Sequence, residues 1–76
     1  MSNKVSVLRK IMEEVYTSKT FDEGINIVKN YLTSNDCPIR KSEGNMIIQK
    51  SIECTSLPKL QQYITNSWFK YEGMGV

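Results

Sequence analysis

Two cysteines are the first side chains of this sequence whose type fits metal binding or redox chemistry. Cys37 and Cys54 are far apart, and neither belongs to a Cys-x-x-Cys pair. The sequence also contains no histidine, which removes the commonest general base and nitrogen ligand. This pattern does not match a zinc site. We therefore expect no bound metal and two free thiols that pack as small apolar side chains.

Two acidic doublets, Glu13-Glu14 and Asp22-Glu23, are the other candidates for chemistry. Adjacent residues on a helix point about 100° apart, so a doublet does not form a carboxylate pair. Ion pairing with the preceding basic residues explains the first doublet, and helix capping explains the second. The glycines match no phosphate-binding loop. We expect no catalysis, no cofactor and no small-molecule substrate.

A third group of polar side chains falls at helical spacing near the C-terminus. Cationic and amide side chains contact phosphates and base edges, and the last helix of a helix–turn–helix takes the recognition position. The net charge of +2, from ten basic and eight acidic residues, is low for a dedicated nucleic-acid binder. Binding of DNA or RNA is therefore the alternative function. Its residues are Arg40, Lys41, Lys59, Gln62, Asn66 and Lys70.

Aromatic residues gather in the same C-terminal segment: Tyr63, Trp68, Phe69 and Tyr71. Trp68 and Phe69 are adjacent, so on one helix they cannot point the same way, and one of them should remain exposed. Exposed aromatic side chains are common anchors of protein–protein interfaces. We take these aromatics as the favoured interaction surface.

Two amphipathic helices should open the fold. The first spans residues 4–16, and the second follows a capping box at Thr20-Phe21-Asp22-Glu23 and ends near residues 33–36. Their apolar positions recur at three and four residues. These positions are Val5, Leu8, Ile11 or Met12, and Val15, then Phe21, Ile25, Val28 and Leu32.

Residues 37–54 fit either a helix or a β-hairpin. In the hairpin, Glu43-Gly44-Asn45 turns a strand from Met46 back onto Ile39. In the helix, Ser42 is the N-cap. The helix is favoured because Lys50 would lie on the apolar face of the strand. Its expected buried stripe is Ile47, Ile48, Ser51, Ile52 and Thr55.

The last predicted helix begins after Ser56, with Pro58 in the first turn, where a missing N–H costs nothing. Gly73 is the expected stop, so residues 1–72 should form one domain and residues 73–76 a flexible tail. The apolar positions are Leu57, Leu60, Ile64, Trp68 and Tyr71.

Together these elements predict an all-α domain of four helices in two helix–turn–helix pairs, with an α+β fold as the alternative. A chain of 76 residues forms one small core, which favours burial against a partner. We expect a non-catalytic protein-interaction module, self-associating or a small subunit of a larger assembly. The sequence contains no alanine and much Ile, Lys and Asn, as A/T-rich viral or phage genomes encode.

The apolar segments of the sequence are too short for a signal peptide or a transmembrane helix, and this predicts where in the cell the protein is located. The stretch Val5-Ser6-Val7-Leu8 is shorter than the apolar region of a signal peptide, about 7–15 residues. No segment approaches the roughly 20 apolar residues of a transmembrane helix. We expect a protein of the cytoplasm, or of the nucleus in a eukaryotic host, with no membrane partner.

Overall fold

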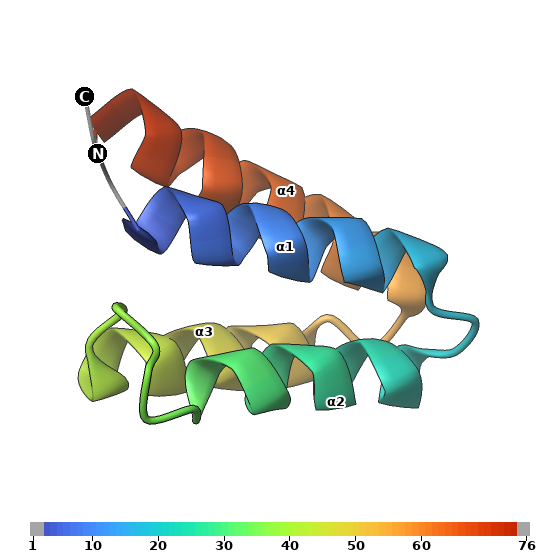
Figure 1. Cartoon of the computed structure of the whole chain (residues 1–76). Coiled ribbons are helices and arrows are strands. Elements are labelled where there is room, and N and C mark those ends of the chain that lie inside the picture. The colour runs from blue at the N-terminus through green and yellow to red at the C-terminus, as the bar shows by residue number, and fades with distance from the viewer. Residues whose placement is uncertain (1–2, 75–76) are drawn as a thin grey trace.

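The computed structural model describes residues 3–74 and contains four helices joined by short turns (Figure 1). They are α1 (Asn3–Thr17), α2 (Phe21–Leu32), α3 (Lys41–Glu53) and α4 (Leu57–Met74). No strand occurs within residues 3–74. The all-α prediction is therefore confirmed, and the hairpin alternative at residues 37–54 is wrong.

The helices form two layers, α1 beside α4 and α2 beside α3 (Figure 1). Each layer thus pairs helices from different halves of the sequence, although successive helices are joined as two helix–turn–helix units. The start of α1 and the end of α4 lie at the same end of the molecule (Figure 1). The core lies on one side of the layer formed by α1 and α4, so the other side of these two helices faces outward.

The core lies between the two layers and uses most of the apolar positions that the sequence periodicity predicts for α1, α2 and α4. Val5 is the exception, because it is only partly buried and lies outside the core cluster. Leu8, Ile11, Val15, Leu60 and Ile64 are fully buried. Phe21, Leu57, Trp68 and Tyr71 pack against the edge of the core and remain partly exposed. The other buried apolar residues are Ile25, Val28, Leu32, Ile39 and Ile47.

The predicted surface of α3 needs correction. Ile52 is 42% exposed and Thr55 is exposed, so the buried stripe is narrower than the sequence suggested. Only Ile47 and Ser51 of the expected stripe are buried, and Gly44 joins them because α3 lies close to α2 there. The expected N-cap Ser42 is also wrong: α3 begins at Lys41, and its N-cap residue makes no side-chain capping hydrogen bond.

The capping box at the start of α2 is confirmed. The Glu23 amide donates to Thr20 Oγ1 at 3.1 Å, and the Thr20 amide donates to Glu23 Oε2 at 3.2 Å. Two backbone N–H groups that the helix leaves unpaired are thereby satisfied. This cap fixes where the chain leaves α1 and enters the second layer.

The end of α4 differs from the prediction. The helix passes through Gly73, the expected stop, and ends at Met74. Gly73 is therefore helical rather than the first residue of a flexible tail, and the rest of that predicted tail, residues 75–76, lies outside the described residues. None of the helices within residues 3–74 combines the length and apolarity needed to cross a membrane.

Candidate functional site

The structure divides the four aromatic residues of the predicted interaction surface between two sides of α4. Tyr71 points toward α3, where its hydroxyl donates to the Glu43 carboxylate. Tyr63 lies near Cys54 at the end of α3, and its burial raises the pKa of its phenol. Trp68 and Phe69 lie on the side of α4 that borders α1. The aromatics therefore form no single patch, and only Trp68 and Phe69 lie on the side of α4 that faces away from α3.

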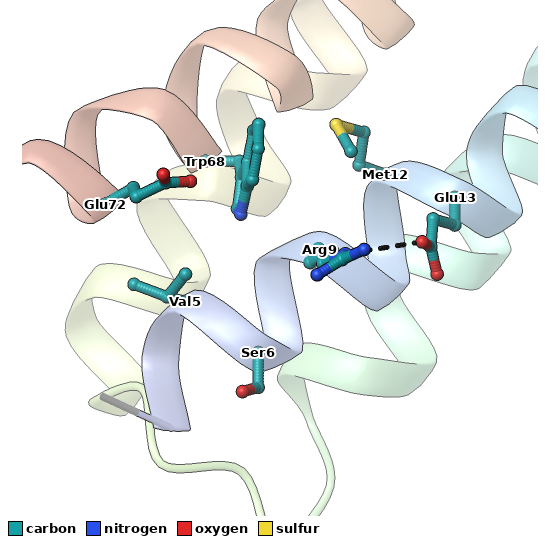
Figure 2. A pocket seen from close by; sticks show the side chains of 7 residues that line it. All are labelled: Val5, Ser6, Arg9, Met12, Glu13, Trp68 and Glu72. Carbon is teal, nitrogen blue, oxygen red and sulfur yellow. Dashed lines mark ion pairs between the residues drawn. The ribbon is translucent and has the colours of Figure 1, made fainter. Parts of the chain in front are cut away.

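Trp68 lines a shallow, open groove of about 570 Å³ between α1 and α4 (Figure 2). Its indole Nε1 is buried and has no hydrogen-bond partner among the described residues. A buried donor without an acceptor costs about 1–3 kcal/mol. The site therefore carries a polar group that the described part of the chain does not satisfy.

Among residues 4–73, Phe69 is the most exposed large apolar side chain, at 60%. Its ring packs against Trp68, with centroids 4.8 Å apart and planes inclined by 54°. Tilted pairs at this separation are favourable for aromatic rings. Phe69 thus packs against a residue that lines the groove, but it does not line the groove itself. The prediction that one of the two would remain exposed is confirmed.

The α1 side of the groove combines apolar and charged side chains, which are Val5, Ser6, Arg9, Met12 and Glu13. Glu72 completes the lining from α4 (Figure 2). Arg9 Nε lies 3.4 Å from Glu13 Oε2, and both side chains are mostly exposed. The ion pair predicted for Glu13 is therefore present, whereas Glu14 of the same doublet forms no ion pair with a described residue and accepts from Tyr31 instead. The lining thus mixes three apolar side chains with four polar or charged ones.

Tyr16 extends this surface and was missed in the sequence analysis. Its side chain is 53% exposed, and its hydroxyl shares a hydrogen bond of 3.0 Å with Thr65 Oγ1 of α4. The signal was present, because Met12 and Tyr16 are four residues apart and flank the buried stripe of α1 on one side. We call the outer surface formed by Arg9, Met12, Glu13, Tyr16, Trp68 and Phe69 the α1–α4 face.

Comparison with protein-family models, with curated proteins and with solved structures finds no match to this chain.

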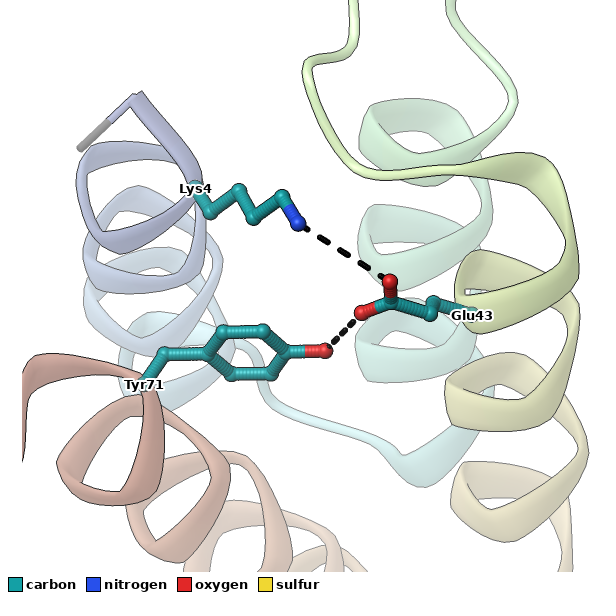
Figure 3. A network of polar contacts seen from close by, with 3 residues as sticks. All are labelled: Lys4, Glu43 and Tyr71. Carbon is teal, nitrogen blue, oxygen red and sulfur yellow. Dashed lines mark hydrogen bonds and ion pairs between the residues drawn. The ribbon is translucent and has the colours of Figure 1, made fainter. Parts of the chain in front are cut away.

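The polar contact between α3 and the outer layer is a small network (Figure 3). Glu43 accepts from the Tyr71 hydroxyl and lies 3.8 Å from Lys4 Nζ. The Tyr71 hydrogen bond, with the nearby cations Lys4 and Arg40, lowers the pKa of Glu43. Burial, followed by the bond to Glu43, raises the pKa of Tyr71 to about 12. This arrangement fastens the layers together and leaves Tyr71 engaged within the fold.

The residues of the nucleic-acid alternative are all exposed. The four on α4 fall on one side of the helix, where Lys59 and Lys70 are separated by about 16 Å along its axis, at 1.5 Å per residue. Arg40 and Lys41 stand at the start of α3, and Arg40 is near Glu43. Gln62 and Asn66 complete the α4 set.

The residues considered for chemistry have structural roles. Glu14 accepts a hydrogen bond from the Tyr31 hydroxyl, and Glu23 caps α2. Cys37 and Cys54 are free and lie beyond opposite ends of α3, whose 13 residues span about 20 Å. That separation exceeds the roughly 7 Å limit for a disulfide between their Cα atoms. No group of metal-binding side chains occurs in the described part of the chain.

Proposed function

We propose that this chain is a non-catalytic protein–protein interaction module that binds its partner through the α1–α4 face. The observation that carries the proposal is the exposed Phe69 ring, which packs against Trp68, a residue that lines the groove. Large aromatic side chains at the centre of a contact supply most of the binding free energy in many interfaces.

The surroundings of Phe69 support a protein partner over a small molecule. The groove is only partly enclosed, whereas small-molecule sites enclose most of their ligand. Tyr16 and Met12 add adaptable apolar area, and the Arg9–Glu13 pair provides a polar edge.

The test is a photo-cross-linking comparison in cells that make the protein. A photoreactive phenylalanine analogue replaces Phe69 in one variant and Met46 in the control. Met46 is a matched position because it is 55% exposed but lies on α3, in the other layer. We expect protein adducts from position 69 and few from position 46. The proposal is wrong if position 69 yields no protein adduct, or yields no more than position 46.

Nucleic-acid binding is the second candidate, and one observation favours it. Lys59 and Lys70 are exposed on one side of α4, and neither forms an ion pair with another described residue. Replacing both with glutamate should then abolish a salt-sensitive complex with DNA or RNA, because phosphate contacts release counterions. Filter binding at two salt concentrations measures this. Absence of binding by the unmodified chain at low salt would contradict the candidate.

A further inference from the structure

The exposed side of α1 carries a basic turn followed by an acidic turn. Arg9 and Lys10 precede Glu13 and Glu14 by one helical turn. Arg9 and Glu13 both line the groove, with side chains 65% and 59% exposed. Opposite charges placed one turn apart become complementary when two copies of the same helix pack antiparallel, since each basic residue then faces the acidic residue of the other helix.

The contacts between α1 and α4 fix which residues lie at the same height on the α1–α4 face. Tyr16 bonds to Thr65, and Gln61 Nε2 donates to the Val15 carbonyl at 3.3 Å. At the other end, Val5 lines the groove together with Glu72. The two helices are therefore antiparallel, and the middle of α1 lies at the height of Trp68 and Phe69.

We propose that the α1–α4 face binds a second copy of this chain across a two-fold axis that crosses α1 at the height of Ile11. Ile11 is midway between Arg9 and Glu13, so the axis places Arg9 of each copy opposite Glu13 of the other. The same axis crosses α4 near Phe69, so the two Phe69 rings meet at the centre. One operation thus pairs both charges and covers the most exposed apolar side chain. This inference rests on the proposed function.

The size of the α1–α4 face limits the surface area that a dimer can bury. The 15 residues of α1 span about 22 Å, so the contact is one layer of two helices. The smallest specific interfaces bury about 600 Å² per partner, roughly one eighth of this chain's 5064 Å². The dimer is therefore reversible and depends on protein concentration.

The test uses two charge reversals and their mixture. Arg9→Glu gives a chain with two acidic residues at these positions, and Glu13→Arg gives a chain with two basic residues. Each variant alone should self-associate at least about tenfold more weakly than the unmodified chain, because like charges then face each other. An equimolar mixture of the two should associate as a heterodimer. Sedimentation equilibrium of each variant and of the mixture measures this.

Matched controls are Lys29→Glu on α2 and Glu53→Arg on α3. They make the same changes of charge at exposed positions of the other layer. Far-ultraviolet circular dichroism confirms that every variant stays helical. The second-copy inference is wrong if the unmodified chain is monomeric at millimolar concentration, or if the mixture associates no better than the single variants. Protein adducts at position 69 with a mass other than two chains would then leave the interaction function standing.

Discussion

The ring centroids of Trp68 and Phe69 are 4.8 Å apart, but the two adjacent side chains differ in their exposure to solvent. Trp68 is partly buried against α1, whereas Phe69 is 60% exposed. A fully solvated phenylalanine gains little from folding, but one held by a neighbouring ring is positioned before a partner arrives. Such preorganisation lowers the entropy cost of binding. The α1–α4 face therefore carries an exposed ring that is packed against its neighbour.

The bond between Tyr71 and Glu43 predicts how stability depends on alkaline pH. The pKa of Tyr71 rises from 10.0 to about 12 on folding, so its neutral form is favoured in the fold. The contribution of neutral Tyr71 to the free energy of unfolding is complete below pH 10 and is lost as the pH rises through 12. Tyr71→Phe should lower the free energy of unfolding near neutral pH by about 1 kcal/mol. Urea unfolding at a series of pH values measures both effects.

The acidic limb of the same profile is a second check on this bond. Glu43 has a pKa below its ordinary value of 4.5, chiefly because Tyr71 donates to it. Its contribution is therefore present above pH 4.5 and is lost as the pH falls through the lowered pKa. Tyr71→Phe should lose less stability on acidification than the unmodified chain. Identical pH profiles for the two proteins would show that the bond does not couple the layers.

Replacing either of two buried glycines, Gly24 on α2 and Gly44 on α3, with alanine should change the stability of the fold, but in opposite directions. At Gly44 a Cβ would lie 3.5 Å from the Leu32 carbonyl oxygen, which is ordinary contact. Removing glycine from a helix interior there should stabilise the fold by about 0.5–1 kcal/mol. At Gly24 a Cβ would lie 2.7 Å from Leu60 Cδ2, and Leu60 is fully buried.

Overpacking of this kind costs about 1–3 kcal/mol, more than the helix gains from alanine. Gly24→Ala should therefore lower the midpoint of thermal unfolding, and Gly44→Ala should raise it. A Gly24→Ala variant as stable as Gly44→Ala would mean that α2 and α4 do not cross as closely as described.

Thr55, in the turn between α3 and α4, has a φ of 66°. This left-handed conformation is costly for a β-branched residue, by about 1–2 kcal/mol. Thr55→Gly should relieve that cost, although glycine adds freedom to the unfolded chain. We expect a net gain of about 0.5–1 kcal/mol. Thermal unfolding compared with Thr33→Gly is the measurement, since Thr33 has an ordinary φ of −98° and glycine there should not stabilise.

The sequence predicts this fold where local signals and apolar period agree. The capping box at Thr20 and Glu23 locates the start of α2, and the period of α4 identifies Leu60 and Ile64 as core. Between residues 37 and 54 the signals conflict, because a narrow apolar stripe fits both periods. Only contact with α2 across Gly44 shows which side of α3 is buried.

The proposed interaction surface was predictable in part. Periodicity shows that Trp68 and Phe69 diverge, so one exposed aromatic follows from the sequence alone. It does not show that Tyr71 reaches across to Glu43 or that Tyr16 reaches Thr65, since both contacts depend on how the layers pack. For this reason the structure replaces the predicted aromatic cluster with a face shared by α1 and α4.

The most direct test of the account is the solution mass of three chains, measured by multi-angle light scattering across a dilution series. The unmodified chain and Met46→Ser should rise from 8.8 kDa toward twice that mass as concentration increases. Phe69→Ser should remain at 8.8 kDa. It should stay folded, because losing the contact with Trp68 costs at most about 1.5 kcal/mol. A Phe69→Ser chain that associates as strongly as the unmodified protein would contradict the α1–α4 face as its binding surface.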